Sequence, residues 1–341
     1  MHDDLWSRLA PLEVEVDGYE LEPREHETPN FVRKSTTVAL TGGGVQGRGE
    51  DVSYSPDDQE AHRRLGPLPL RGRRTLAEWS ALLDEQELFP QPTVQHAARD
   101  YRRWAYESAL LDLALRQAGT TLGGLVGRAY SPVRFVVSSN LDPARWIALY
   151  PDVEMKVDAG AEWGTAEFER LAATGVIRVV DIKGQYGSDY DQGERDEAGL
   201  VRMAADALPD AIIEDPSTSP EVLPEIQRAA GRISFDAPVH AVSDLAALPP
   251  IRHLNVKPSR FGTVERLCEC LDHCLREGIS MYAGGQYELG VGRAQIQALA
   301  SLFYPDGPND CAPGAYNAPE PTAGLPVSPL TEPAWRDLTA F

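Results

Sequence analysis

Four lysines stand out among the cationic residues of this 341-residue chain. Of its 32 lysine and arginine residues, 28 are Arg, and the lysines are Lys34, Lys156, Lys183 and Lys257. An Arg guanidinium serves surfaces and ion pairs but keeps its proton near neutral pH, whereas a Lys ammonium can release its proton when its pKa is lowered. Each lysine is therefore a candidate for proton transfer, and its position in the fold decides between candidates.

Three carboxylates follow short apolar stretches at regular intervals. Asp181, Glu214 and Asp236 are separated by 33 and 22 residues, each interval being about one strand, one helix and their loops. On neighbouring strands of a barrel these acids converge at its mouth, where they would repel one another if unpaired. A divalent cation removes this repulsion, and an all-oxygen site suits Mg²⁺ or Mn²⁺. Surface carboxylates or ion pairs with nearby Arg are the alternative.

Two of the lysines flank these acids along the chain. Lys156 lies one strand before them and Lys257 one strand after them, so the two face the predicted cation from opposite sides. Lysines placed in this way can remove and return a proton at the carbon next to a metal-chelated carboxylate. We therefore predict Lys156 and Lys257 as the acid/base pair. Schiff-base chemistry on one of these lysines is a weaker hypothesis, because it leaves the acids unexplained.

Alternating strands and helices must position these residues from 131 onward. Strands are expected at 134–138, 153–158, 177–182, 211–214, 232–236, 253–256 and 279–282, and helical segments at 162–174, 195–208, 220–230, 243–248, 263–277 and 293–303. Such alternation predicts a parallel sheet, either open or closed into a barrel. Seven repeats, with a possible eighth strand near Cys311–Tyr316, favour an α/β fold of the modified (β/α)7β TIM-barrel type.

The first 130 residues predict a separate α+β domain. An alternating, β-rich segment at 31–40 is followed by a turn at 41–44, and helices are expected near 75–87 and 92–118. The glycine-rich run at 42–49 leads into an extended acidic segment, so it predicts a hairpin and not a phosphate-binding loop. We expect the domains to be 1–130 and 131–316, with the proline-rich segment 317–341 packing back on the first.

Four motifs in the second part resemble the enolase superfamily, in the branch of muconate-lactonizing enzyme, o-succinylbenzoate synthase and N-succinylamino acid racemase. The segments Glu154-Met-Lys-Val-Asp-Ala-Gly160, Ile213-Glu-Asp-Pro216, Leu254-Asn-Val-Lys-Pro-Ser-Arg-Phe-Gly262 and Gly284-Gly-Gln-Tyr-Glu-Leu-Gly-Val-Gly-Arg293 are similar to its K-x-K, E-[ED]-P, K-x-S-R-x-G and G-G-x-x-E-x-G-x-G-R segments. Gly47–Glu50 and Ser108–Arg116 are similar to its N-terminal capping domain. The resemblance implies a capped barrel, with Glu214 as a metal ligand and Lys257 as the second catalytic lysine.

The chain departs from that pattern at three strands. The family's D-x-N is here Asp181-Ile-Lys183, its D-E is Asp236-Ala-Pro238, and the first Lys of K-x-K is Glu154. Asp158-Ala-Gly-Ala-Glu-Trp163 is similar to a family D-A-N-G-x-W segment, but strand counting assigns it to the second strand, which leaves Asp181 as the third-strand ligand. We expect the amine of Lys183 to point at Glu214 or Asp236 and to lower the affinity for metal.

The leading hypothesis is an isomerase or lyase that depends on Mg²⁺ or Mn²⁺ and abstracts a proton α to a carboxylate. Racemisation, epimerisation and β-elimination all fit this chemistry. Lys183, Gln286 and Glu288 are expected to contact substrate or to support the catalytic groups, and Arg24 and His26 are further possible contacts. The alternative is a catalytically degenerate enolase-like barrel that binds a ligand without turnover. Stoichiometric Mg²⁺ binding favours the enzyme.

Composition narrows the class of partner. A net charge of −20 argues against nucleic acid and anionic membrane surfaces, and no stretch approaches 18 consecutive apolar residues. The acidic start of the chain is unlike a signal peptide, so we expect a cytoplasmic protein. The spacing of Cys268, Cys270 and Cys274 suits buried, unpaired cysteines better than a zinc site. We expect a small-molecule carboxylate as substrate and a homo-oligomer as the assembly.

Overall fold

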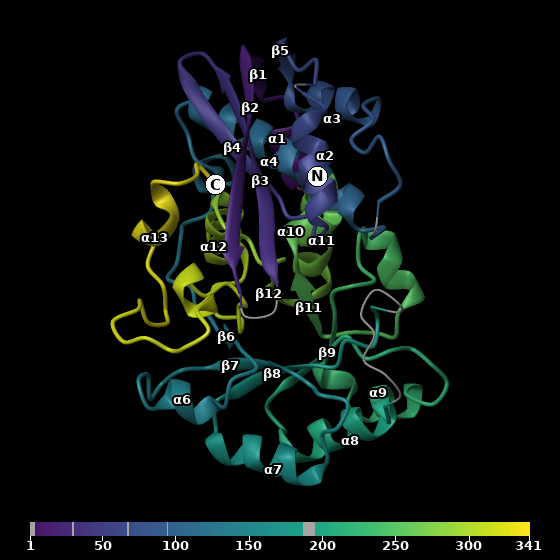
Figure 1. The fold of residues 1–341 in the computed structure, drawn as a ribbon. Helices are drawn as coiled ribbons and strands as arrows, with labels where there is room; N and C mark the ends of the chain where they lie inside the picture. The colour runs from purple at the N-terminus through teal and green to yellow at the C-terminus, as the bar shows by residue number, and fades with distance from the viewer. Residues whose placement is uncertain (1–3, 29–30, 67, 94, 187–194) are drawn as a thin grey trace.

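The N-terminal part of the chain is built on antiparallel strands and one long helix. The structure, a computed structural model, describes residues 4–28, 31–66, 68–93, 95–186 and 195–341 (Figure 1). The elements here are α1 (Leu5–Leu9), β1 (Glu13–Val16), β2 (Gly18–Glu27), β3 (Val32–Gly42), β4 (Val45–Asp51), α2 (Pro56–Arg64), β5 (Gly72–Thr75), α3 (Leu76–Asp84), α4 (Ala98–Gln117) and α5 (Leu122–Val126). β2, β3 and β4 form one sheet, and β1 pairs with β5. The predicted hairpin is confirmed, because Gly42 pairs with Val45 across its turn.

Two glycines of β4 allow α4 to lie directly on the sheet. A Cβ atom at Gly49 would lie 2.0 Å from the carbonyl oxygen of Ala105, and one at Gly47 would lie 2.3 Å from the backbone nitrogen of Leu113. Neither contact is sterically possible, so the helix can approach this closely only where the strand has no side chain. The central residues of α4 are buried on every side of the helix, and they include polar and charged side chains as well as apolar ones.

The second part forms a parallel sheet whose strands follow one another in chain order. Its strands are β6 (Val137–Ser138), β7 (Met155–Asp158), β8 (Ile177–Asp181), β9 (Ile212–Glu214), β10 (Ile233–Phe235), β11 (His253–Val256) and β12 (Ser280–Ala283). Its helices are α6 (Pro143–Ile147), α7 (Thr165–Thr174), α8 (Glu197–Ala207), α9 (Leu223–Arg228), α10 (Pro258–Phe261), α11 (Val264–Glu277), α12 (Val291–Phe303) and α13 (Pro333–Arg336), with 3₁₀ turns at Ala230–Arg232, Val242–Ala247 and Gly314–Asn317. The expected α/β fold of the TIM-barrel type is confirmed.

The expected eighth strand is not formed at Cys311–Tyr316. That segment ends in a 3₁₀ turn, because Pro313 and Gly314 interrupt any extended run. The preceding residues close the barrel instead. The backbone nitrogen of Val136 donates to the carbonyl oxygen of Asn309 at 2.9 Å, and the backbone nitrogen of Asp310 donates to Ala283, at the end of β12, at 2.8 Å. Residues 309–310 therefore join the two edges of the sheet.

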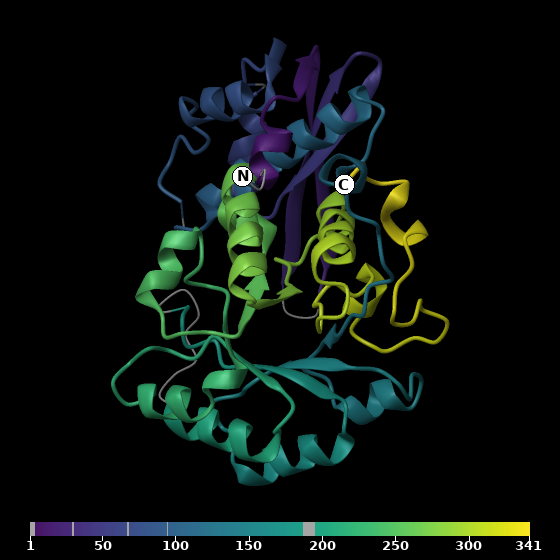
Figure 2. The same ribbon diagram turned by 180° about the vertical axis from the view of Figure 1, so that it is seen from behind.

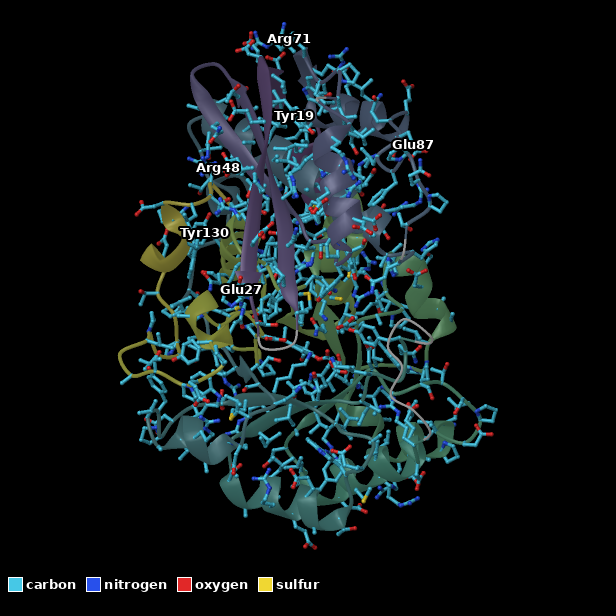
Figure 3. The ribbon with its side chains drawn as sticks, viewed as in Figure 1. Tyr19, Glu27, Arg48, Arg71, Glu87 and Tyr130 are labelled. Carbon is cyan, nitrogen blue, oxygen red and sulfur yellow. The ribbon has the colours of Figure 1, made fainter. Side chains whose placement is uncertain are left out.

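The three-stranded sheet reaches down to the open end of the barrel. β2 and β3 descend from the distal end, near Arg71, so that Glu27 lies much closer to the barrel than Tyr19 does (Figure 3). α7 and α8 cover the outer side of the barrel wall that lies farthest from this sheet (Figures 1 and 2). Glu50 fixes this arrangement, because its carboxylate accepts hydrogen bonds from the backbone nitrogens of Leu289, Gly290 and Gly292 at 2.7–3.0 Å.

The last residues of the chain return to α4. The Asp112 carboxylate accepts bonds from the Thr339 hydroxyl and the Ala340 backbone nitrogen, and the Phe341 ring packs edge-on against Trp104. The four cysteines are free and buried, as expected for packing residues. Within the described ranges, no helix is both long and apolar enough to cross a membrane.

Candidate active site

A cavity of about 570 Å³ lies where the barrel strands end and the N-terminal sheet descends. Both parts of the chain line it. The N-terminal part contributes Phe31, Tyr54, Gln95 and Tyr101, and the barrel contributes among others Lys156, Asp158, Asp181, Lys183, Tyr186, Lys257, Arg260, Gln286, Tyr287, Arg293 and Asp310. Three of the four lysines thus reach one cavity, and a volume of this size suits a small organic ligand.

Lys156 extends from β7 into a buried group of carboxylates. Its Nζ atom lies 2.5 Å from Oε1 of Glu214, 3.2 Å from Oδ2 of Asp181 and 3.7 Å from Oδ2 of Asp310. Burial alone would lower the pKa of Lys156, but Glu214 and Asp181 raise it well above its usual value. The side chain is therefore held as an ammonium ion in this arrangement, 3% exposed and at the edge of the cavity.

Lys257 follows β11 and contacts a different acid. Its Nζ atom forms an ion pair with Oδ2 of Asp236, whose other oxygen lies 2.8 Å from Nη2 of Arg260. Burial opposes the charge on Lys257, but Asp236 and the nearby Tyr186 raise its pKa. In turn, Arg260 and Lys257 overcome the effect of burial on Asp236 and hold the pKa of that carboxyl below its usual range. Lys156 and Lys257 therefore have separate carboxylate partners.

Glu214 lies at the end of β9 in a network that encloses both of its oxygens. Oε1 accepts from Lys156 and from the Asn255 amide at 3.0 Å, and Oε2 accepts from the Tyr282 hydroxyl at 2.5 Å. Burial raises the pKa of Glu214 to about 7; Lys156 opposes this shift, and Asp181 and Asp236 add to it. Of the three acids, Glu214 is thus the one whose charge depends on pH near neutrality.

Lys183 is bound to Asp181, which corrects the expectation that its amine would point at Glu214 or Asp236. Its Nζ atom lies 2.9 Å from Oδ2 of Asp181 and 3.1 Å from Oδ1 of Asp158. The reason is local: Lys183 has a φ of 57°, so its chain turns back over β8 and toward the end of β7. Although burial would raise it, the pKa of Asp181 falls to about 2 beside Lys183 and Lys156.

The strand assignment of these acids is confirmed. β6 and β7 are the first two barrel strands and Asp181 ends β8, the third; Asp158 ends β7 and pairs in register with Asp181. Asp158 is therefore a neighbour of the predicted ligand on the preceding strand. In this structure Asp158 forms the second ion pair of Lys183.

The donor types of the site fit a hard divalent cation. Asp181, Glu214 and Asp236 end or follow three successive strands, and all three are fully buried. Their carboxylates offer oxygen ligands, which a hard divalent cation prefers. Within the described residues, however, no three His, Cys, Asp or Glu side chains form a group that could hold a metal ion. The cationic side chains are the physical reason, because each of these carboxylates is turned toward a Lys or an Arg.

Gln286 and Glu288 lie on the loop after β12 with different surroundings. Gln286 lines the cavity, its Oε1 accepts from the Tyr54 hydroxyl at 3.2 Å, and its buried Nε2 has no partner among the described residues. Glu288 accepts a bond from the Gln286 backbone nitrogen at 2.6 Å. Burial raises the pKa of Glu288. Gln286 is thus placed to touch a ligand, whereas Glu288 positions Gln286.

Other expected contacts lie further from the acids. Arg24 donates to Thr37, and the ring of His26 lies 6.2 Å from that of Tyr287. Neither residue is among those that line the cavity, whereas Phe31, on the same hairpin, is.

Several site residues were not identified from the sequence. They are Arg260 and Tyr186 beside Asp236, Asn255 and Tyr282 beside Glu214, Asp310 beside Lys156, and the buried Arg33, which donates to the carbonyl oxygens of Gln286 and Tyr287. Arg260 carried a signal, because it lies in the K-x-S-R-x-G segment. Asn255 carried a weaker signal as the polar residue of an otherwise apolar strand.

The chain is similar in sequence and in fold to several known proteins. The chain is 24% identical over 299 residues to an o-succinylbenzoate synthase from Geobacillus kaustophilus, covering 80% of this chain and 75% of the relative. It is 37% identical over 78 residues to an N-succinylamino acid racemase from an Amycolatopsis species, covering 23% of this chain and 20% of the relative. The structure of a dipeptide epimerase from Methylococcus capsulatus, in complex with Mg and the dipeptide L-Arg-D-Lys, matches with a TM-score of 0.65 at 18% identity, covering 90% and 93% of the two chains.

These matches confirm the resemblance to proteins of the enolase superfamily, and they confirm the capped barrel as the fold. The proteins named in these matches are isomerases and lyases, which is the class of enzyme that the sequence led us to expect. Residues 129–318 match a family described as domain of unknown function (DUF8230), C-terminal domain, and residues 7–125 match its N-terminal domain. The chain belongs to this DUF8230 family.

Proposed function

We propose that this protein abstracts a proton from the carbon α to the carboxylate of a small organic acid, with Lys156 and Lys257 as the acid/base pair. The observation that supports the proposal most directly is their position. Both lysines reach the same cavity of about 570 Å³, from strand ends on either side of the acids, and each has its own carboxylate partner. A carbon held between them has one proton carrier on each side.

The residues around the pair define what each lysine does. Lys156 and Lys257 are both held as ammonium ions by Glu214 and Asp236, so either can donate a proton to a carbanionic carbon. The lysine that acts as base must first lose its proton, which requires its carboxylate partner to bind another cation or to take up a proton itself. The pKa of Glu214, at about 7, makes it the partner most easily neutralised in this way.

Asp181, Glu214 and Asp236 are the residues that would hold a divalent cation, Mg²⁺ or Mn²⁺. When bound, such a cation would stabilise negative charge on the substrate carboxylate as a Lewis acid. The Gln286 amide, whose Nε2 is buried and without a partner in the described structure, is the donor available for a substrate oxygen away from the acids.

Hydrogen exchange at carbon tests the proposal without knowledge of the final product. Small α-substituted carboxylates, among them N-acylated amino acids and dipeptides, are incubated with the protein and Mg²⁺ in D₂O, and loss of the Cα proton signal is followed by NMR. We expect at least one compound to exchange this proton at a rate that depends on protein concentration. A panel that binds to the cavity but shows no exchange would contradict the proposal.

The second candidate is a barrel that binds a carboxylate without turnover. One observation favours it, namely that Asp181, Glu214 and Asp236 are already neutralised by Lys and Arg side chains. Calorimetry separates the two functions. Saturable binding of a carboxylate that is indifferent to Mg²⁺, with no Cα exchange, supports the binding protein, whereas stoichiometric Mg²⁺ binding together with exchange supports the enzyme.

A further inference from the structure

Lys183 engages both oxygens of Asp181 by itself. Its backbone nitrogen donates to Oδ1 at 2.9 Å, and its Nζ atom donates to Oδ2 at 2.9 Å. The first bond depends on the left-handed backbone of Lys183, whose φ of 57° is uncommon for any residue other than glycine, asparagine or aspartate. A strained backbone is thus maintained at the position where the side chain closes over a predicted metal ligand.

The ammonium of Lys183 has a second partner already in contact. Oδ1 of Asp158 lies 3.1 Å from Nζ, and the side chain of Asp158 is 27% exposed, whereas that of Asp181 is 1% exposed. Asp158 can therefore accept the ammonium alone, with water on its other side. Asp181, in contrast, has no access to bulk water and depends on cations from within the site.

We propose that Lys183 and a divalent cation exclude one another at Asp181, and that the ammonium leaves Asp181 and keeps its contact with Asp158 when the cation binds. The inference rests on the proposed role of Asp181 as a metal ligand. Lys183 and Lys156 already place two ammonium groups within ion-pair distance of Oδ2 of Asp181, so a divalent cation there would be repelled strongly, because the surrounding protein screens charges less than water does. The site then binds metal more weakly than its three carboxylates alone would allow.

Lys156 also lies near Asp181 but is the weaker competitor there. Its distance to Oδ2 of Asp181 is 3.2 Å, and its shorter contact, of 2.5 Å, is with Glu214. Lys183 has the closer contact, donates from two of its own atoms, and has an exposed alternative partner. The competition at Asp181 is therefore assigned to Lys183.

Metal titration of the full-length protein tests this inference without any substrate. Isothermal titration calorimetry with Mg²⁺ and Mn²⁺ is performed on the wild type and on Lys183→Asn and Lys183→Met. Asn tolerates the left-handed backbone, and Met preserves the length of the side chain without a ligand oxygen. We expect both variants to bind metal more tightly, by roughly tenfold or more, because one unit of positive charge is removed from beside the Asp181 carboxylate.

Lys34→Met is the matched control. Lys34, on β3, pairs with Glu25 on β2 and Glu60 on α2, and it is not among the residues that line the cavity, so this variant changes the net charge by the same amount away from the cavity. We expect its metal affinity to equal that of the wild type. A comparable gain in Lys34→Met would show that overall charge is responsible and would overturn the inference. Circular dichroism and thermal melting establish that each variant is folded.

Asp158→Asn separates displacement onto Asp158 from simple electrostatics. In the wild type this change should weaken metal binding twice over, since it removes a nearby negative charge and the alternative partner of Lys183. In the Lys183→Met background only the first effect remains, so the loss should be smaller. Equal losses in both backgrounds would overturn the displacement.

The remaining outcomes distinguish this inference from the proposed function. If the wild type binds metal and both Lys183 variants bind it equally or less tightly, the competition is wrong while the metal assignment stands. If neither the wild type nor any Lys183 variant binds Mg²⁺ or Mn²⁺, the metal assignment fails and this inference fails with it.

Discussion

The molecule buries carboxylates in two regions, and it neutralises them with different cations. In the N-terminal part, Asp51 is fully buried and contacts Arg102 at 2.8 Å and His62 at 3.2 Å. In the barrel, Glu214 and Asp236 are equally buried but contact Lys156 and Lys257, and Asp236 has Arg260 as a second cationic partner. Burial of charge is therefore common to both regions and does not by itself mark a functional site.

The difference lies in the kind of partner that each cation has, because backbone oxygens help to hold Arg102 whereas side-chain carboxylates hold Lys156. Besides Asp51, Arg102 donates to the backbone oxygens of Leu88 and Asp58 at 2.8 Å, so its planar fork is held on three sides. Lys156 is a single ammonium on a flexible chain, and it borders a cavity of about 570 Å³. The first arrangement is suited to holding a structure and the second to exchanging partners or protons.

The largest expected effect breaks the barrel side of this comparison. Lys257→Arg retains the positive charge beside Asp236 but removes a group that can lose its proton. We expect Cα exchange with an active carboxylate to fall by about 10³-fold or more, in line with the removal of a general acid or base. The same change at Lys156 should have an effect of similar size. Near-normal exchange in Lys257→Arg would refute the two-lysine mechanism.

Arg102→Met is expected to have the next largest effect, on stability and not on chemistry. It leaves the buried Asp51 without its main cation, and breaking a buried pair in this way costs about 3–5 kcal/mol. Urea denaturation should show this loss in the free energy of unfolding. Arg73→Met is the control, because its partner Glu13 is as exposed as Arg73 itself and surface pairs contribute at most about 1 kcal/mol.

Glu214→Gln should abolish stoichiometric Mg²⁺ binding and leave the fold intact. The amide keeps the volume of the side chain. Its oxygen can still accept from Lys156 and Asn255, and its NH2 group can donate to the Tyr282 oxygen, whose hydroxyl can donate to Ser234 instead, so we expect a destabilisation of no more than about 1–3 kcal/mol. Calorimetry measures the metal affinity, and circular dichroism checks the fold. If the affinity matches that of the wild type, Glu214 is not a ligand.

The backbone of the barrel could be predicted because its strands are short apolar runs between helices. β11 has the bounds that were expected, His253–Val256, and the acids fall at strand ends because a parallel barrel places all those ends on one face. The closing strand could not be predicted. Asn309 closes the barrel through two hydrogen bonds, which its oxygens accept from the backbone nitrogens of Val136 and Ala283. A contact of this size leaves no periodic pattern in the sequence.

The contacts within the site were harder to predict than its members. Spacing brings Lys183 to the same strand end as Asp181, but only the left-handed φ of Lys183 sends its amine toward Asp158. Tyr282 reads as an ordinary core residue of its strand, yet its hydroxyl contacts Glu214 at 2.5 Å. The sequence shows only that the Tyr282 ring suits the core, whereas the structure also shows that its hydroxyl belongs to the site.

The smallest expected effect is on the pH dependence of stability, where the two regions should act in opposite directions. Burial lowers the pKa of His62, with Asp51 opposing the shift. Below its ordinary pKa of about 6.5, the unfolded chain takes up a proton that folded His62 refuses, so this residue lowers the free energy of unfolding as pH falls. The folded pKa of Glu214, raised to about 7 by burial, has the opposite consequence. Between its unfolded pKa near 4.5 and pH 7, folded Glu214 keeps a proton that the unfolded chain releases, so it lowers the free energy of unfolding as pH rises.

Urea denaturation at pH 5.5 and 7.5 in EDTA resolves the two contributions as differences from the wild type. His62→Gln should remove the loss of stability on the acid side, so this variant gains stability relative to the wild type at pH 5.5 compared with pH 7.5. Glu214→Gln should shift the same difference the other way. Other titrating groups, including the buried His253, are common to all three proteins and cancel in the comparison. Shifts of the same sign in the two variants would show that folding does not raise the pKa of Glu214, and the contrast between the two regions would be lost.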